Sequence, residues 1–355
     1  MRGRQFRLAY FLLIFTFGMI IFTRAIGREE SQTPAPSVDQ AVPLELLATF
    51  PGEEQESKGV YLRQGAAITC DPERNRIYIV DSMENCILVF DFEFRYVKTI
   101  GKEGQGPGEM ENPLYIALNS DLNFMSIREG GNRRIDLFNL AGDFIKSFPY
   151  QKSGMGIGIL PSGDILQPVR SDDLNEPLVL AFDQEGKIKQ GFGKRIDFGE
   201  NTRSLNETLM SVNREGYVVL AYNEINKVVV FDREGKPIVD RALPSKEMDE
   251  AEKYNIKSKY DPATGSQRFR TVIAGVFATS KAVYVSRYFP ELKIFQIDYR
   301  GDVKAVFSYP EEKDYIGGRL CVDEKSGRIY VIQNYPESNV QVFRLPAKSP
   351  LMKNE

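Results

Sequence analysis

The chain contains no histidine and no tryptophan among its 355 residues. Histidine is the commonest general base in enzymes and the commonest ligand of transition metals in proteins. Its absence excludes Ser-His-Asp and Cys-His catalysis, and it excludes every zinc or iron site that needs imidazole. We name no catalytic residue and no metal-ligating residue from the sequence, although a calcium site held by carboxylate and Asn oxygens needs no histidine.

Cysteine is also scarce, with only Cys70, Cys86 and Cys321 in the chain. No two of them form a Cys-x-x-Cys pair, so we do not expect a structural zinc site. The odd number leaves at least one thiol unpaired within the chain. We expect Cys70 and Cys321 to lie on inner strands of the first and last repeats described below. Either a disulfide between them or two separate buried thiols would fit that position.

Charge of either sign is present in nearly equal amounts, with 46 basic and 49 acidic residues and a net charge of −3. Residues 1–27 hold four of the arginines and no acidic residue, so the remainder carries 42 basic and 49 acidic residues, a net charge of −7. A mildly acidic domain argues against nucleic acid as a partner.

The N-terminus carries an export signal. Arg2, Arg4 and Arg7 precede an apolar run of 16 residues at positions 8–23, and a cationic segment followed by an apolar run directs export. The length lies between that of a cleaved segment and that of a membrane-spanning helix. Residues 1–27 are therefore either a signal peptide or a single-pass membrane anchor. In both cases the domain lies outside the cytoplasm, at the cell membrane, in the periplasm or secreted. Residues 28–43 are predicted to form a flexible linker.

A five-residue unit recurs along the chain: an aromatic or aliphatic residue, Asp or Asn, two spacers, then Gly. Asp or Asn suits the first position of a type I turn, and Gly suits the last position, where φ is positive. Because alternating apolar runs flank each unit, each predicts a tight β-hairpin. The glycines lie 44, 49 and 66 residues apart, a spacing typical of a β-propeller. The copies are Phe138 to Gly142, Phe182 to Gly186, Phe231 to Gly235 and Ile297 to Gly301, with Phe90 to Phe94 as a copy that lacks the glycine.

The repeats divide into four short strands each, and the sixth repeat lacks its outer strand. The segment 44–50 is a spare strand, and we expect it to pair with the sixth repeat and close the ring. The predicted strands are 66–70, 76–80, 86–90 and 94–100; 115–118, 123–127, 134–138 and 144–148; 156–160, 164–169, 178–182 and 188–192; 209–212, 217–222, 228–231 and 238–242; 272–278, 282–287, 293–297 and 303–307; and 319–322, 328–333 and 340–343.

The predicted fold is therefore all-β, a six-bladed β-propeller over residues 44–346 that is closed by an N-terminal strand and preceded by an N-terminal hydrophobic helix. The wide spacing of the last two hairpins marks a charged insert at 243–270. Ser245 is expected to cap a short helix over Lys246–Tyr254 there, outside the core. Residues 347–355 are expected to be a disordered tail.

Residues 99–119 read Thr-Ile-Gly-Lys-Glu-Gly-Gln-Gly-Pro-Gly-Glu-Met-Glu-Asn-Pro-Leu-Tyr-Ile-Ala-Leu-Asn. This resembles the linker of NHL-repeat propellers, in which Gly-x-Gly-Pro-Gly-Glu precedes Pro-x-x-Ile-Ala-Val-Asp. The segment 131–138 is similar to that family's Asn-Asn-Arg-Ile-x-x-Phe. The resemblance covers about residues 76–148 and departs at Met110, where the family has an aromatic residue. It implies an exported bacterial propeller that binds protein, peptide or glycan through its loop face.

Candidate site residues lie where the second strands end, in loops that propeller topology gathers on one face. Arg128, Arg170 and Arg287 share this position, and three guanidiniums around one mouth would suit carboxylate or phosphate groups. Alternatively, each arginine pairs with a neighbouring loop carboxylate such as Glu129 or Asp172. The candidate ligand-binding residues are Arg128, Arg133, Arg170, Tyr222, Asn223, Arg287, Tyr288 and Asn334.

Three functions compete. The first is a non-catalytic binding or scaffold module, a monomer without a cofactor, for protein, peptide or glycan ligands. The second is a calcium-dependent lactonase or hydrolase-like propeller, in which carboxylate and Asn oxygens hold the ion. The candidate positions favour Arg over Asp or Glu, which favours the binding module. The third is a sensor domain for a membrane partner, which agrees with an N-terminal anchor.

Overall fold

The computed structural model describes residues 41–150, 152, 154–287, 290–310, 316–335 and 337–346. The predicted signal peptide or anchor, most of the predicted linker, the predicted tail and Tyr288 lie outside the described residues. Within the described ranges, none of the helices has the length and apolar character needed to cross a membrane.

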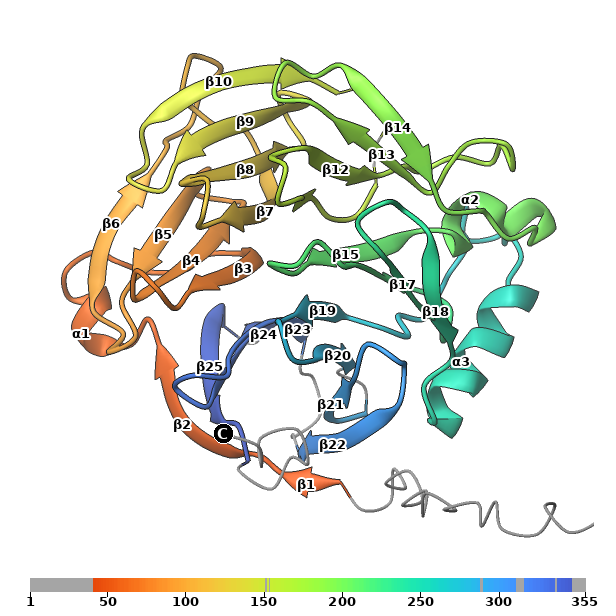
Figure 1. The fold of residues 1–355 in the computed structure, drawn as a ribbon. Coiled ribbons are helices and arrows are strands. Elements are labelled where there is room, and N and C mark those ends of the chain that lie inside the picture. The colour runs from red at the N-terminus through yellow and green to blue at the C-terminus, as the bar shows by residue number, and fades with distance from the viewer. Residues whose placement is uncertain are drawn as a thin grey trace, which may run out of the picture. The chain divides into compact units, whose positions relative to one another are not determined.

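Six sheets follow one another in chain order, and in each of them consecutive strands pair antiparallel (Figure 1). We call them blades 1 to 6. Their strands are β3 (Gly65–Asp71), β4 (Arg76–Asp81), β5 (Cys86–Phe90) and β6 (Tyr96–Ile100); β7 (Pro113–Asn119), β8 (Phe124–Glu129), β9 (Arg134–Asn139) and β10 (Phe144–Pro149); β11 (Gly158–Ile159), β12 (Ile165–Pro168), β13 (Val179–Phe182) and β14 (Ile188–Phe192); β15 (Thr208–Val212), β16 (Val218–Tyr222), β17 (Val228–Phe231) and β18 (Pro237–Arg241); β19 (Gly275–Ala278), β20 (Val283–Arg287), β21 (Leu292–Ile297) and β22 (Val303–Tyr309); and β23 (Ile316–Asp323), β24 (Arg328–Tyr335) and β25 (Asn339–Arg344).

The first strands of the blades form a closed circuit. β3 contacts β7, and the contacts continue through β11, β15 and β19 to β23, which contacts β3 again. The first strands therefore surround a central channel, and the second, third and fourth strands lie progressively further out. This arrangement confirms the predicted all-β, six-bladed propeller.

The N-terminal strands extend the last two blades. β2 (Glu45–Phe50) pairs antiparallel with β25 and becomes the fourth strand of blade 6. Its last residue, Phe50, is buried, and its ring lies 5.0 Å from the rings of both Phe90 and Phe94 in blade 1. β1 (Val42–Pro43) pairs in parallel with β22 of blade 5, within residues that the sequence assigns to the linker.

The recurring hairpin unit has the geometry that its sequence predicts. Gly142, Gly186, Gly235 and Gly301 have φ values between 81° and 88°. The Asp or Asn side chain accepts a main-chain hydrogen bond four residues on, as between Asp183 Oδ1 and the amide of Lys187 at 2.8 Å. In blade 1 Phe94 adopts φ 64° in place of glycine. The turn therefore persists, and β6 begins two residues later than predicted.

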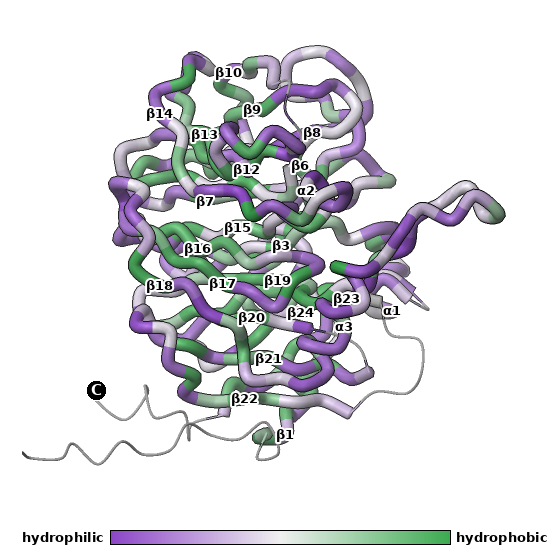
Figure 2. Tube along the Cα trace, turned by 90° about the vertical axis from the view of Figure 1, so that its right-hand side faces the viewer, coloured by the Kyte–Doolittle hydropathy of each residue, from purple (hydrophilic) through white to green (hydrophobic). Residues whose placement is uncertain are grey.

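Apolar side chains fill the space between neighbouring blades. Figure 2 shows the hydrophobic positions gathered along strands such as β16 and β19 and the hydrophilic ones in the turns. The second and third strands are buried along most of their length, whereas fourth strands such as β14 are largely exposed. The three cysteines are buried free thiols, with Cys70 on β3 and Cys321 on β23, so the alternative of separate thiols holds.

The insert is only partly as predicted. Ser245 Oγ accepts the amide of Met248 at 3.4 Å and caps α3 (Lys246–Lys257), which ends three residues later than expected. Met248 is 1% exposed and packs with Leu243 in the apolar core between blades 4 and 5. The expectation that the insert lies outside the core is wrong on this side, because a helix near a sheet buries its few apolar residues. The remaining short helices are α1 (Glu53–Glu56), η2 (Gly199–Asn201) and α2 (Thr202–Leu205).

Candidate functional site

The central channel widens at one end into a cavity of about 700 Å³, which we call the central cavity. Its walls are side chains of the first strands from all six blades, and most of them are apolar, such as Ile68, Met210 and Leu320. Its rim consists of the turns between the first and second strands. The charged residues of the lining are Asp71, Glu73, Asp121, Arg214, Lys281, Asp323, Glu324 and Lys325.

The central cavity lies at the end of the channel that sequence reasoning did not select. Because the strands alternate in direction, the turns between first and second strands share a face with the recurring hairpins. The predicted ligand loops, which follow the second strands, lie at the other end. The width of the channel depends on how side chains from six strands that are distant in sequence pack together. No local sequence pattern predicts which end of the channel is wider.

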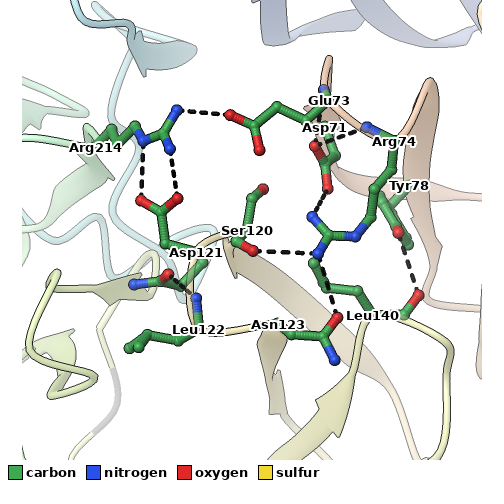
Figure 3. A network of polar contacts seen from close by, with 11 residues as sticks. Asp71, Glu73, Arg74, Tyr78, Ser120, Asp121, Leu122, Asn123, Leu140 and Arg214 are labelled. Atoms are coloured by element: carbon green, nitrogen blue, oxygen red, sulfur yellow. Dashed lines mark hydrogen bonds and ion pairs between the residues drawn. The ribbon is translucent and has the colours of Figure 1, made fainter.

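Arg214 spans part of the rim (Figure 3). It lies in the turn after β15 of blade 4, and its Nη1 is 2.6 Å from Glu73 Oε1 in blade 1. Its Nε donates to Asp121 Oδ2 in blade 2 at 2.9 Å, and Nη2 reaches Oδ1 of the same carboxylate. The three side chains are 60%, 53% and 51% exposed. One exposed guanidinium thus joins three blades across the mouth of the central cavity.

A second network joins blades 1 and 2 beside the contacts of Arg214 (Figure 3). Asp71 is buried, and its Oδ2 accepts a 2.9 Å bond from Arg74 Nη1. The same guanidinium donates to the main-chain oxygen of Ser120 at 3.2 Å, as Figure 3 shows. Asp71 Oδ1 accepts the amides of Glu73 and Arg74. Asp71 therefore shapes the turn that presents Glu73 to Arg214.

The channel is narrow at the end of the predicted ligand loops. Its cavity there measures about 60 Å³ and is lined by Tyr115, Gly275 and Arg319 among others. A Cβ atom on Gly275 would lie 2.2 Å from the main-chain oxygen of Gly318, so glycine permits the close approach of the inner strands there. The guanidiniums of Arg128 and Arg319 lie 4.6 Å and 5.0 Å from the ring centre of Tyr115.

The three predicted arginines are all engaged. Arg128 is buried, and its Nη1 donates to the main-chain oxygen of Gly154 at 2.7 Å. Arg170 forms an ion pair with Glu207 of the next blade. Burial raises the pKa of Glu207, while Arg170 and, less strongly, Arg128 oppose this shift. The structure therefore pairs Arg170 with a carboxylate of the adjacent blade, which sequence reasoning missed.

Arg287 lies apart from the other two. It is buried beside the insert, and its Nη1 is 3.6 Å from Glu247 Oε2 at the start of α3. Burial lowers its pKa, and Glu247 opposes this. Pairing with a loop carboxylate, the alternative that the sequence left open, thus applies to Arg170 and Arg287. The partners come from an adjacent blade and from the insert, not from Glu129 or Asp172.

The other predicted residues have mixed surroundings. Tyr222 is buried in β16, which raises its pKa. Asn223 Nδ2 donates to the main-chain oxygen of Ile273 at 2.9 Å. Asn334 joins blade 6 to blade 1, because it accepts from the amide of Gly65 at 3.0 Å and donates to its oxygen at 2.9 Å. Arg133 is exposed.

A buried cluster of charged side chains contacts the Gly-rich linker within residues 99–119. Arg134 Nε lies 2.8 Å from Glu129 Oε1 and 2.9 Å from Asp136 Oδ1, and both carboxylates are fully buried. The guanidinium also donates to main-chain oxygens of the Gly-rich linker, at Gln105, Gly106 and Glu109. Burial, reinforced by Glu129, raises the pKa of Asp136 to about 8. These motif residues hold the linker in place.

The pKa of one more carboxyl group is shifted among the loops that follow the second strands. Burial raises the pKa of Glu224 to about 7, and the nearby Glu207 adds to the shift. No group of three or more Cys, Asp or Glu side chains with metal-binding geometry occurs among the described residues.

A family model described as "6-bladed beta-propeller" matches residues 70–257, which is more than half of the chain. The chain belongs to this family. No curated protein matches the propeller.

Solved structures show the same fold at low sequence identity. A Bacteroides fragilis protein described as a "Putative exported protein" has a TM-score of 0.58 and 14% identity over 88% of the propeller chain and 97% of its own. The β-propeller domain of Cps50 (Swd1) from Myceliophthora thermophila has a TM-score of 0.51 and 9% identity, over 86% and 100% of the two chains.

A third similar structure is an enzyme. Virginiamycin B lyase from Staphylococcus aureus has a TM-score of 0.50 and 13% identity, covering 81% of this chain and 98% of that one. That structure is of a catalytically inactive variant in which a histidine is replaced by alanine. The propeller, by contrast, has no histidine anywhere in its sequence. These three similarities establish the fold, and the function has to be inferred from the residues of the site.

Proposed function

We propose that this propeller is an exported NHL-type binding or scaffold module, held at the membrane or free in the periplasm, that binds protein, peptide or glycan ligands without catalysis. The cationic and apolar N-terminal sequence supports export, and the description of the Bacteroides fragilis protein of the same fold as a "Putative exported protein" agrees with it. The ligand surface is the loop side, which we define as the loops after the second strands and those between blades. β2 closes the ring and holds this surface together.

Unsatisfied guanidinium nitrogens carry the proposal. Nε of Arg128, and Nε and Nη2 of Arg287, are buried and have no hydrogen-bond partner in the part of the chain that the structure describes. A buried donor without an acceptor is costly, because its hydration is lost and not replaced. A guanidinium donates two parallel hydrogen bonds to a carboxylate. The loop side is therefore suited to a ligand that brings carboxylate groups, such as an acidic peptide or an acidic glycan.

The test is a binding profile of the full-length chain in mild detergent against arrays of acidic, neutral and basic peptides and glycans. The variant Arg128→Gln with Arg287→Gln should lose acidic ligands by about tenfold or more, because hydrogen bonds to charged groups are lost. The control Arg95→Gln with Arg233→Gln removes the same charge from exposed arginines on the hairpin face. An unchanged profile in the loop-side variant, with its fold intact by circular dichroism, contradicts the proposal.

A further inference from the structure

The central cavity has the size and lining of a small-molecule site. Binding pockets for such ligands usually measure about 300–1,000 Å³, with apolar walls and a few placed polar groups. The central cavity has about 700 Å³, walls from the first strands and a charged rim. It would bury an apolar body among side chains such as Ile116, Val276 and Leu320 and leave a polar head at the rim.

The rim contains a matched pair of carboxylates at the mouth. Glu73 and Asp121 come from different blades, and both contact the guanidinium of Arg214. Arg214 reaches them from blade 4, so two carboxylates hold a cationic group at the opening of the cavity (Figure 3). The site already accommodates a cation, and that cation is at the tip of a flexible side chain.

The contact of Arg214 is easy to open. Ion pairs between exposed side chains contribute little to stability, because water screens the charges and ordering two long side chains costs entropy. More than half of each of the three side chains is exposed. Swinging Arg214 into solvent would leave two carboxylates facing the mouth, and a competing cation could take the place of the guanidinium.

The charge at the rim favours a cation over an anion. The cavity lining has five acidic and three basic residues, and two of the acidic ones converge on one point. An anion would have to compete with Glu73 and Asp121 for Arg214. A cation gains both carboxylates and has only the weak exposed contacts of Arg214 to displace.

We propose that the central cavity binds a small amphipathic cation, an amine or guanidine on an apolar body, whose charged group lies between Glu73 and Asp121 in place of the Arg214 guanidinium. This site is separate from the loop side, so each proposal can fail without the other.

The test compares three probes that share one apolar body: 4-phenylbutylamine, 4-phenylbutanol and 4-phenylbutyrate, titrated calorimetrically into the full-length chain. The amine should bind more tightly than the alcohol, and the butyrate least tightly. Arg214→Gln should tighten amine binding by about twofold to fivefold, because the amine no longer competes with the exposed ion pairs of Arg214, and exposed ion pairs are worth a factor of this size. Glu73→Gln with Asp121→Asn should weaken amine binding by about the same factor or more and leave the alcohol unchanged.

Two further variants locate the binding. Val212→Phe replaces a small aliphatic side chain of the cavity wall by an aromatic ring and should abolish binding of the amine and the alcohol alike. Glu185→Gln with Glu234→Gln removes two exposed carboxylates from hairpins of the same face and should change nothing. The proposal is overturned if the amine shows no saturable binding, if Arg214→Gln weakens it, if the butyrate binds most tightly, or if Val212→Phe has no effect while its melting curve is unchanged.

Discussion

The buried cluster of Glu129, Arg134 and Asp136 makes the stability of the propeller depend on pH in an unusual direction. Two fully buried carboxylates share one guanidinium, so one negative charge remains uncompensated in the interior. This favours a proton on Asp136, whose pKa rises from 3.8 to about 8. The protonated carboxyl can donate to Glu129 while it accepts from Arg134. An asparagine at position 136 would offer the same donor and acceptor without a charge.

The sign follows from linkage. Between the unfolded and the folded pKa, the native state binds a proton that the unfolded state lacks, so the free energy of unfolding falls as pH rises. The contribution of Asp136 is complete below about pH 4 and is lost as the pH passes through about 8. One pKa unit corresponds to about 1.4 kcal/mol, so roughly 2 kcal/mol should be lost between about pH 6 and pH 8.

The assay is urea denaturation followed by circular dichroism at a series of pH values in that range. Asp136→Asn should flatten the pH dependence relative to the wild-type chain and should be the more stable protein at the alkaline end. Asp298→Asn is a control that should leave the slope between about pH 6 and pH 8 unchanged, because hydrogen bonds from Lys304 and main-chain amides outweigh burial and lower the pKa of Asp298. Its stabilising effect is present at neutral pH and is lost as the pH falls through the lowered pKa. Parallel curves for the wild type and Asp136→Asn would refute the reasoning about a shared proton.

Three further outcomes follow from packing and from the proposed absence of catalysis. Phe50→Ala should lower the free energy of unfolding by about 3–5 kcal/mol, because this buried ring packs on Phe90 and Phe94 across the junction of blades 6 and 1. The exposed neighbour Leu47→Ala should change it by no more than about 0.5 kcal/mol, and equal effects in urea titrations would contradict a closing role for β2. Met248→Ala should lower the free energy of unfolding by about 2–5 kcal/mol, because this side chain is buried. Met83→Ala, at an exposed site, should leave the free energy of unfolding nearly unchanged, and thermal melts of the two variants can be compared. Calcium and a chelator should both leave the melting temperature unchanged, and a rise of several degrees with calcium would favour the lactonase alternative.

The strands were predictable because each blade repeats a local signal. The hairpin unit fixes a turn through an Asp or Asn side chain and a residue with positive φ, and both act within five residues of the chain. β5, β14 and β17 accordingly have the predicted bounds. The observed strand bounds differ from the predicted ones where a single residue adopts a backbone conformation that a strand does not allow. Gly156, at φ 118°, keeps the start of the predicted 156–160 strand out of β11.

The site was less predictable because its contacts join distant parts of the chain. Arg214 lies 93 residues from Asp121 and 141 residues from Glu73 in sequence, so no spacing pattern links them. The loop-side arginines did stand out, since they share one position in the repeat. Their partners Glu207 and Glu247 depended on how the next blade and the insert pack.

The carboxylates of the central cavity lining differ in their partners, and Glu324 Oε1 accepts hydrogen bonds from the hydroxyl groups of Thr279 and Tyr284. Asp71 and Asp323 are the last residues of the first strands β3 and β23, and their oxygens accept main-chain amides of the turn that follows. They belong to the turn chemistry that a propeller repeats from blade to blade. Glu73 and Asp121 lie two residues after the turn begins in blades 1 and 2, and within the described chain their oxygens contact Arg214 instead. Because the fold does not need these two carboxylates for its turns, their convergence on one cation at the mouth is the feature of the rim that a ligand can use.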